Sequence, residues 1–489
     1  MPDLVIIHPG ASHGIYGSDL AKSLVAVEPP LWARLIAGYI EDRGYSVEII
    51  DAEVMGYSPQ QAAEAAVQKH PRLICIAVYG HQPSASTQQM DGASATARMI
   101  KLRDNTIPVI MVGGHVAALP EQTLREEPIT WACSGEGPIT ITALLAGILP
   151  IERVPGLVRW EKGHVVLNEP TPLINVNELN GDAWHLLPMD KYRAHNWQCF
   201  GDLGARQPYA SIYTSLGCPY KCSFCCINSP FGTNVYRTRA PVDVVLEIIR
   251  LYRDYGVRTF KIIDELFILN PRHYIPICDG IIAAGLGDKI NIWAYARVDT
   301  VSEGTLDLLR QAGIRWLALG IESASAYVRD GAQKRLKNDD IKGVVRAIQA
   351  ADINVIGNYI FGLPDDDMAS MQATLDLALD LRCEFANFYS AMAYPGSPLY
   401  AQALAQGWSL PESWRGYSQH NSDCRPLDTL HVSAAAVLRF RDHAFNSYFT
   451  DPGYLALVRA KFGAETLAHV KAMTTYKLKR KLLPETLVA

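Results

Sequence analysis

Short apolar runs alternate with helical patterns through the first part of the chain. The runs occupy residues 4–7, 47–50, 73–79, 108–112 and 130–133. Consecutive apolar residues indicate strands buried on both faces, and the segments between the runs are long enough for helices. Residues 1–150 are therefore predicted to form a doubly wound, Rossmann-like α/β domain.

A second alternation begins near residue 201. Its six strand-like segments are 209–214, 258–263, 290–296, 315–320, 354–360 and 385–390. Six βα repeats predict a (β/α)6 partial TIM-type barrel over residues 201–395, with its reactive residues at the carboxyl ends of the strands. Residues 151–200 lose the periodicity and are rich in proline, which is typical of a linker. Residues 396–489 are predicted to form a small, mainly helical C-terminal domain.

Composition excludes several classes of protein. Of the 489 residues, 49% are hydrophobic and 19% charged, which is typical of a globular chain and excludes disorder as the dominant state. The formal charge of -5 gives no support for a nucleic-acid partner. No apolar run approaches the ~18 residues of a membrane span, and the N-terminus has no basic segment before its apolar stretch. A cytoplasmic location is expected.

Four of the ten cysteines lie within nine residues, from Cys218 to Cys226. Cys218, Cys222 and Cys225 form a CxxxCxxC triplet directly after the first predicted barrel strand. Three thiolates on one loop can hold three corners of an iron-sulfur cube or three positions on zinc. Zinc needs a fourth protein ligand, and Cys226 cannot easily join Cys225 on one ion because adjacent side chains diverge. Unligated core thiols are the remaining alternative.

The triplet, with Phe224 before its last cysteine and a six-unit barrel around it, resembles the radical S-adenosylmethionine superfamily. In that superfamily the three cysteines hold a 4Fe-4S cluster, and its open iron chelates S-adenosylmethionine. An electron from the cluster then cleaves the cofactor to methionine and a 5′-deoxyadenosyl radical. The resemblance implies Phe224 near the cofactor and a reducing electron donor such as flavodoxin or ferredoxin. Cys226 lies outside the motif and is expected to be a buried thiol.

Other residues at the predicted strand ends match the same family. Asp264 and Glu265 follow the second strand, where family members contact the methionyl amino group, although the more widespread GGE version is absent. Arg297 and Glu322 end the next strands and resemble residues that bind the ribose or carboxylate of the cofactor. An acid beside a ribose diol accepts two hydrogen bonds. Gly362 resembles the glycine whose backbone packs on adenine. Each charged residue could equally form a structural ion pair, and their joint order favours the functional interpretation.

The segment containing Arg237 and Arg239 resembles the RxRS-type segment of the cobalamin-linked branch of this family. These arginines could steer carboxylates or form scaffold ion pairs. The N-terminal domain in turn resembles the cobalamin-binding domain of that branch, through residues 28–53, 112–124 and 134–138.

Ligands of a doubly wound sheet lie beyond the carboxyl ends of its strands. The cobalamin contacts expected there are Tyr79, His81, Gly113, Gly114, His115, Gly135 and Glu136. No GxGxxG loop and no DxHxxG signature occurs, so no histidine can be named as the lower cobalt ligand. Tyr79 and His81 are the candidates for facing the cobalt, and a hydrogen-bonded loop role stays open for each histidine.

Taken together, the resemblances imply a cobalamin-dependent radical S-adenosylmethionine enzyme with a 4Fe-4S cluster, S-adenosylmethionine and cobalamin. The predicted reaction transfers methyl via methylcobalamin to an unactivated carbon of a small-molecule or natural-product substrate. Alternatives are cyclisation, ring contraction or oxidation without methyl transfer, a radical enzyme that has lost cobalamin, and a non-enzymatic metal-binding module. Methylthiotransferases need three further N-terminal cysteines, and only Cys75 and Cys133 precede residue 199.

Overall fold

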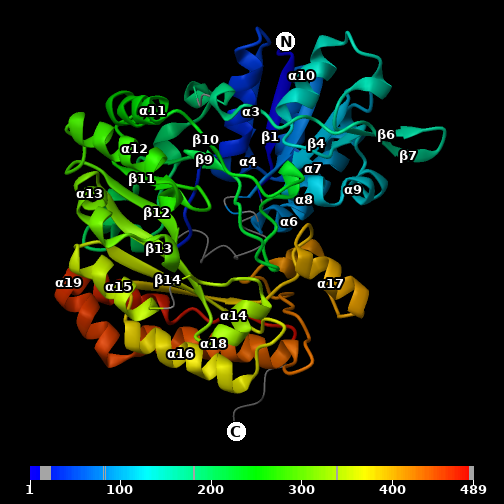
Figure 1. The fold of residues 1–489 in the computed structure, drawn as a ribbon. Helices are drawn as coiled ribbons and strands as arrows, with labels where there is room; N and C mark the ends of the chain where they lie inside the picture. Colours follow the sequence, from blue (N-terminus) through cyan, green and yellow to red (C-terminus); the bar gives the residue numbers. More distant parts are fainter. Residues whose placement is uncertain (11–23, 81, 83, 180–181, 338–339, 484–489) are drawn as a thin grey trace.

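A computed structural model describes residues 1–489 except 11–23, 81, 83, 180–181, 338–339 and 484–489. Two parallel sheets dominate the fold (Figure 1). The N-terminal α/β domain lies at the upper right of the view, the curled sheet of the barrel at the left, and the C-terminal helices beneath the barrel. The predicted α/β fold class is confirmed.

The N-terminal sheet has the strand order β2-β1-β3-β4-β5-β6-β7, and its first five strands run parallel. The strands are β1 (Leu4–His8), β2 (Val47–Asp51), β3 (Leu73–Val78), β4 (Val109–Gly113), β5 (Trp131–Cys133), β6 (Leu157–Glu161) and β7 (His164–Leu167). The helices are α3 (Leu31–Glu41), α4 (Ala52–Met55), α5 (Pro59–Val67), α6 (Ala85–Gln88), α7 (Met90–Arg103), α8 (Gly114–Ala118), α9 (Pro120–Glu126) and α10 (Pro138–Ala146). Separate apolar cores cover the two faces, with α3 and α10 in one and α5, α7 and α9 in the other. The domain is therefore doubly wound.

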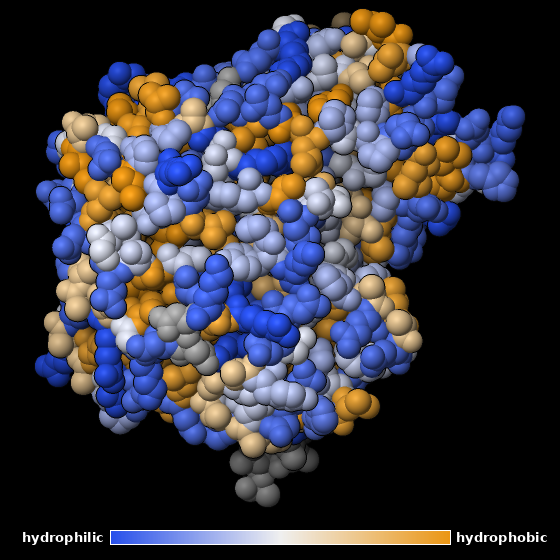
Figure 2. Space-filling view, viewed as in Figure 1, coloured by the Kyte–Doolittle hydropathy of each residue, from blue (hydrophilic) through white to orange (hydrophobic). Residues whose placement is uncertain are grey.

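Two strands arise within the segment expected to be a linker. β6 pairs antiparallel with β5, and β7 pairs antiparallel with β6, so the hairpin extends the N-terminal sheet. A hydrophobic patch lies over this hairpin in Figure 2, where Trp160 and Leu167 are 49% and 44% exposed. Residues 157–167 thus belong structurally with the N-terminal domain.

All six predicted barrel strands form, in the order β15-β14-β13-β12-β11-β8, and every pair is parallel. They are β8 (Tyr209–Ile212), β11 (Thr259–Ile262), β12 (Asn291–Arg297), β13 (Ile314–Glu322), β14 (Asn354–Phe361) and β15 (Phe385–Ser390). The helices between them are α11 (Pro241–Asp254), α12 (Pro271–Ala283), α13 (Leu306–Gln311), α14 (Ala326–Gly331), α15 (Ile341–Ala350) and α16 (Met368–Leu381). In α11, Val244, Ile248 and Leu251 form the buried stripe that the amphipathic pattern requires.

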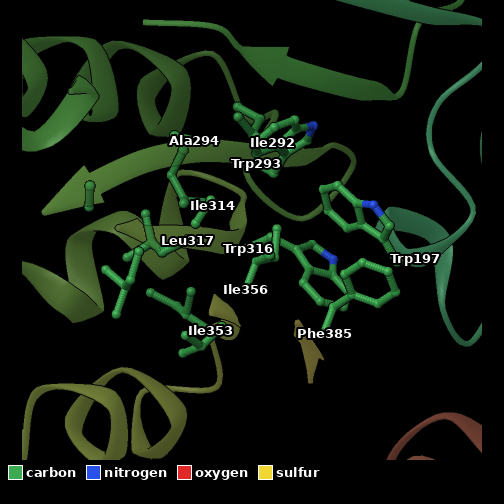
Figure 3. Close-up of a cluster of buried hydrophobic side chains, with 14 of the residues drawn as sticks. Trp197, Ile292, Trp293, Ala294, Ile314, Trp316, Leu317, Ile353, Ile356 and Phe385 are labelled. Atoms are coloured by element: carbon green, nitrogen blue, oxygen red, sulfur yellow. The ribbon is translucent and has the colours of Figure 1, made fainter. Parts of the chain in front are cut away.

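Trp197 fills the centre of an aromatic cluster inside the barrel (Figure 3). It meets Trp293 and Trp316 edge-on at ring-centroid distances of 5.1 and 5.5 Å and stacks on Phe385 at 5.6 Å. These partners belong to β12, β13 and β15, and the residues of β13 and β15 lie near the amino-terminal ends of those strands. The chain preceding the barrel therefore supplies a side chain to the barrel interior.

The C-terminal part consists mainly of α17 (Pro398–Gln406), α18 (Ala434–Thr450) and α19 (Pro452–Met473), with a short 3-10 turn, η11 (Trp414–Tyr417). Helix α18 packs beside β15, the edge strand of the barrel sheet. The η11 turn reaches the N-terminal domain, where Trp414 contacts His115 and Arg415 pairs with Asp91. Within the described residues, no helix has the length and hydrophobicity of a membrane span.

Candidate functional site

The cysteine loop follows β8 and leaves through a short antiparallel pair, β9 (Ser215–Leu216) with β10 (Arg237–Thr238). Gly217 begins the loop at φ +83°, and a Cβ there would lie 2.5 Å from the carbonyl oxygen of Val235. The side chain of Asn228 accepts from the Cys218 amide at 3.3 Å and donates to the Cys218 carbonyl at 3.0 Å. These contacts fold the loop back on itself, with Cys218, Cys222 and Cys225 partly exposed and Cys226 buried.

Two cations lie beside the cysteine loop. Burial raises the pKa of the Cys218 thiol to about 11, and burial also raises the pKa of Cys222. Lys334 and Arg297 oppose the shift at Cys222, because positive charge favours the thiolate. The Nη1 atom of Arg297 lies 3.9 Å from the Cys222 sulfur. The site thus supplies three thiol ligands together with two cations that favour the ionised form of Cys222.

Arg297 ends β12 and is held on three sides. Its guanidinium pairs with Asp299 at 2.9 Å, donates to the Arg335 carbonyl at 2.7 Å and stacks over the Tyr220 ring at 3.9 Å. The side chain is only 3% exposed. The structure therefore places Arg297 against the cysteine loop with its orientation fixed by the protein.

Asp264 and Glu265 follow β11 but have different surroundings. Asp264 is fully buried, and its carboxylate accepts from the Thr214 amide at 2.6 Å and from the Ser215 hydroxyl at 2.6 Å. The Oε2 atom of Glu265 is buried without a hydrogen-bond partner, and burial raises the pKa of this carboxyl to about 8. Asp264 consequently ties β11 to the strand before the cysteine loop, and Glu265 is the acid with an oxygen left to bind an ammonium or hydroxyl group.

Glu322 ends β13 in a left-handed conformation, with φ +64°. A register irregularity between Gly320 and Glu322 interrupts pairing with β14. The Glu322 carboxylate pairs with Lys334 at 2.6 Å, and each side chain is 8% exposed. A non-glycine residue held at positive φ costs about 1–3 kcal/mol and is typical of functional sites.

Phe224 and Gly362 pack against their own surroundings. Phe224 joins two small apolar clusters, which include Leu363 and Leu399. Gly362 has φ +80°, and a Cβ there would lie 2.6 Å from the Val437 side chain of α18. Glycine at this position lets the C-terminal helix approach the end of β14.

Tyr79 and Glu136 of the N-terminal domain are both engaged in contacts with other protein groups. The Tyr79 ring stacks on Trp32 at 4.5 Å, and its hydroxyl donates to the Glu136 carbonyl at 3.0 Å. The Glu136 carboxylate accepts from the Ile174 amide at 2.9 Å and pairs with Arg237 at 2.7 Å. Glu136 therefore connects the two α/β domains, and Tyr79 is held against it within the N-terminal domain.

The remaining predicted cobalamin residues line loops of the same sheet edge. A Cβ at Gly113 would lie 2.0 Å from the Val78 carbonyl oxygen, and one at Gly135 would lie 2.6 Å from the Thr171 hydroxyl. Gly114 begins α8, and the buried His115 ring contacts Thr87 through Nδ1 at 3.2 Å. His81 lies outside the described residues. The cobalamin roles of these residues stay predictions.

The two arginines of the RxRS-like segment form ion pairs in this structure. Arg237 pairs with Glu136, and Arg239 pairs with Glu247 at 2.6 Å. Glu247 also accepts from Trp184 at 2.9 Å and lies 3.3 Å from Arg34 of α3. Arg239 and Glu247 are thus part of a buried network that joins the barrel to the N-terminal domain.

A cavity of about 550 Å³, called here the shared cavity, lies between the N-terminal domain and the barrel interior. Its N-terminal side includes Glu28, Gln82 and Gln89, and its barrel side includes Trp293 and Asn358. Gln82, in the loop after β3, donates to the Tyr295 hydroxyl at 2.8 Å. One compartment is therefore bounded by a strand-end loop of the first sheet and by side chains inside the second.

Several residues of this compartment carry no sequence motif. Lys261 of β11 contacts both carboxylate oxygens of Glu28 at 3.0 and 3.1 Å, and His195 lies 3.4 Å from the same carboxylate. Burial lowers the pKa of His195, which favours the neutral imidazole. In the sequence, Lys261 stands out only as an isolated lysine in an apolar strand. No local pattern identifies Lys334 as the ion-pair partner of Glu322.

The side chains present fit the cofactors implied by the sequence. Three thiols on one loop beside two cations suit a cluster with thiolate ligands. Within the described ranges, no three His, Cys, Asp or Glu side chains converge on a single metal ion. A 4Fe-4S cluster does not require such convergence, because each thiolate binds a different iron. The unpartnered Glu265 oxygen suits the amino group of S-adenosylmethionine.

Two protein families match parts of the chain. Residues 17–145 match the B12 binding domain, and residues 212–378 match the radical SAM superfamily. The chain is 29% identical to "Uncharacterized methyltransferase PH0819" of Pyrococcus horikoshii, over 90% of this chain and 91% of that protein. It is 27% identical to the "Anaerobic magnesium-protoporphyrin IX monomethyl ester cyclase" of Cereibacter sphaeroides, over 82% of this chain and 64% of that longer protein.

The fold also resembles a solved structure. The radical S-adenosylmethionine methyltransferase TsrM from Kitasatospora setae, solved with cobalamin and a [4Fe-4S] cluster bound, superposes with a TM-score of 0.68. At 16% identity, the likeness covers 97% of this chain and all of TsrM. It shows that the order and packing of the domains are shared. The chain thus carries a region that matches the B12 binding domain, followed by a region that matches the radical SAM superfamily, in a fold shared with TsrM.

Proposed function

We propose that this enzyme is a C-methyltransferase whose small-molecule substrate binds in the shared cavity. The observation that carries the proposal is the position of that cavity, which is bounded both by the loop after β3 and by the barrel interior. A substrate there lies between the domain that matches B12-binding proteins and the barrel that carries the cysteine loop.

When bound, the cluster with S-adenosylmethionine supplies a carbon-centred radical and cobalamin supplies a methyl carrier, so the substrate carbon needs no acid-base activation. The protein's own part is binding and orientation. Cys218, Cys222 and Cys225 would hold the cluster, and Glu265 would accept a hydrogen bond from the methionyl ammonium. Arg297 and Glu322 would lie beside the rest of that cofactor.

Exclusion of water is the second task of the chain. Trp197 packs among Trp293, Trp316 and Phe385, so aromatic rings close this end of the cavity. A dry compartment protects a reactive radical from competing reactions. The packed segment before the barrel thereby contributes to catalysis without contacting the cofactor.

The names of the relatives favour methyl transfer. The protein named a methyltransferase aligns along 91% of its own length, whereas the named cyclase has about a third of its length outside the alignment. Cyclisation without methyl transfer is the second candidate, because the cyclase still matches over 82% of this chain.

Anaerobic reconstitution with iron, sulfide and hydroxocobalamin, followed by a reductant such as reduced flavodoxin, tests the proposal. We expect both 5′-deoxyadenosine and S-adenosylhomocysteine by mass spectrometry, since one molecule of S-adenosylmethionine is cleaved and another gives up its methyl group. Formation of 5′-deoxyadenosine with no S-adenosylhomocysteine would contradict methyl transfer and favour the cyclase type of reaction.

A further inference from the structure

The shared cavity has a positively charged cluster on its C-terminal wall, called here the arginine cluster: Arg441, Asp442 and Arg480. Arg441 and Asp442 belong to α18 and line the cavity, and Arg480 lies behind them. The side chains of Arg441 and Arg480 are 7% and 3% exposed. Two buried guanidinium groups therefore share the carboxylate of one aspartate.

Arg480 makes more contacts with the Asp442 carboxylate than Arg441 does. Its Nε and Nη2 atoms contact the two oxygens of Asp442 at 3.0 and 2.9 Å, and its Nη1 donates to the Gln419 carbonyl at 2.8 Å. Arg441 reaches Asp442 through Nη1 alone, at 2.9 Å, and its Nε donates to the Phe388 carbonyl at 2.9 Å. Among the described residues, the Nη2 group of Arg441 makes no hydrogen bond.

An uncompensated buried charge is costly unless a counter-ion completes it. Burial lowers the pKa of Arg441, and the weaker attraction of Asp442 does not offset this effect. A carboxylate or phosphate presents two oxygens at the spacing of guanidinium donors, so it would supply both the missing charge and the missing acceptor.

The charged cluster on the other side of the cavity is already balanced. Lys261 contacts both oxygens of Glu28, and His195 beside them is favoured in its neutral form. An added anion there would meet the Glu28 carboxylate. The charge distribution therefore favours Arg441 over Lys261 as the anion contact.

Aromatic rings occupy the cavity wall between the two clusters. Trp293, Tyr295 and Tyr389 come from the barrel strands, and Phe445 comes from α18, one turn beyond Arg441. The guanidinium carbon of Arg441 lies 5.6 Å from the centroid of the Phe445 ring. Flat apolar groups pack well against such rings.

We infer that the substrate carries a carboxylate or phosphate that binds Arg441, with a flat apolar body against the aromatic wall. The inference rests on the proposed use of the shared cavity as the substrate site. It assigns to α18 a role in substrate selection, because the C-terminal segment supplies the anion contact and the barrel supplies the wall.

Equilibrium dialysis of the reconstituted holoenzyme against 2-naphthoate and 2-naphthamide tests the inference. The two probes share a ring system and differ in charge. We expect naphthoate to bind at least about tenfold more tightly than naphthamide, as expected for a charge-assisted contact. Equal binding by the unaltered enzyme would overturn the inference, and this result requires no variant.

Arg441→Met should remove the preference for the acid, because it keeps an apolar stem of similar length and removes the charge. Arg441→Lys keeps the positive charge and should keep a preference for the acid, although with weaker binding. A folded Arg441→Met protein that still prefers naphthoate would overturn the assignment, and so would a folded lysine variant without any preference. Arg310→Met, which removes an exposed arginine paired with Asp352, is the matched control.

Cobalamin carries a phosphate of its own, so its content must be measured in each variant by absorbance after dialysis. We expect Arg441→Met to retain cobalamin. Loss of cobalamin from this variant would assign Arg441 to that phosphate and overturn the substrate assignment. Because binding is measured without turnover, the result is independent of whether the reaction proves to be methyl transfer or cyclisation.

Discussion

The carboxyl ends of the two parallel sheets occupy equivalent positions in their domains but carry different kinds of side chain. At the barrel end, Glu265 has an unpartnered oxygen and Glu322 is held at positive φ beside Lys334. At the N-terminal sheet, Glu136 pairs with Arg237 of the barrel segment, and Tyr79 packs on Trp32 of its own domain. The N-terminal strand end thus takes part in assembly through Glu136, whereas the barrel strand end keeps one acid, Glu265, with an unsatisfied oxygen.

Backbone conformation shows the same contrast. The unusual conformations at the end of the N-terminal sheet belong to glycines, with φ +154° at Gly113 and +108° at Gly137. At the barrel a glutamate adopts the left-handed region, which glycine would occupy without cost. At Glu322 the ion pair with Lys334 accompanies this strained conformation.

Removing the cysteine triplet should have the largest effect, because it removes the ligands themselves. Replacing Cys218, Cys222 and Cys225 with Ala should abolish iron content and 5′-deoxyadenosine formation, as measured by iron analysis and mass spectrometry. Cys226→Ala is the control, since this neighbouring buried thiol lies outside the triplet. Persistence of either signal in the triple variant would contradict the assignment of the cluster.

Glu136→Gln tests whether the N-terminal strand end serves assembly. It removes the charge that faces Arg237, whose side chain is 15% exposed, so the free energy of unfolding should fall by about 3 kcal/mol. A double-mutant cycle with Arg237→Met isolates the pair, and the exposed Glu121→Gln is the control, with an expected change below about 0.5 kcal/mol.

Cobalamin content separates the two roles of Glu136. Both of its carboxylate oxygens already have partners, so we expect the folded Glu136→Gln variant to keep cobalamin. A loss of cobalamin without a loss of stability would instead support the predicted cobalamin contact and weaken the contrast between the two sheets.

His115→Gln should have the smallest effect, and only at low pH. Burial lowers the pKa of His115 to about 3, so below about pH 6.5 the unfolded chain takes up a proton that the folded chain does not. Stability is therefore lost as pH falls below about 6.5. Between pH 6.5 and 5, protonation of this residue in the unfolded chain should lower the free energy of unfolding by about 2 kcal/mol. The variant should not show this loss.

The measurement is the urea midpoint of unfolding at pH 7.5 and pH 5. His431→Gln, at an exposed position, controls for the loss of a histidine as such. An identical pH dependence in the native chain and in His115→Gln would show that the ring is hydrated and accessible, as a residue facing cobalamin could be.

Much of the site follows from local sequence, because its residues lie at strand ends or on one loop. Patterns that extend over only a few residues predict the six barrel strands and the cysteine triplet. They also predict the positions of Glu265 and Glu322 at the strand ends. The β6–β7 hairpin was not predicted, because its strands are short and only partly buried and lack a continuous apolar run. Lys334 was missed because its ion pair depends on a chain reversal twelve residues beyond Glu322.

Hydrophobic periodicity was enough to determine the class of fold, and the cysteine triplet with the family resemblance of its surroundings implied the class of cofactor, because these signals lie in short-range order along the chain. The tertiary structure decided how those parts are used. In the structure, the Asp264 carboxylate accepts hydrogen bonds from the protein, whereas one oxygen of Glu265 has no partner. Glu136 pairs with Arg237, and Arg441 lines the cavity and shares the Asp442 carboxylate with Arg480. These distinctions depend on which distant groups fill each hydrogen bond and balance each charge, and only the folded chain brings those groups together.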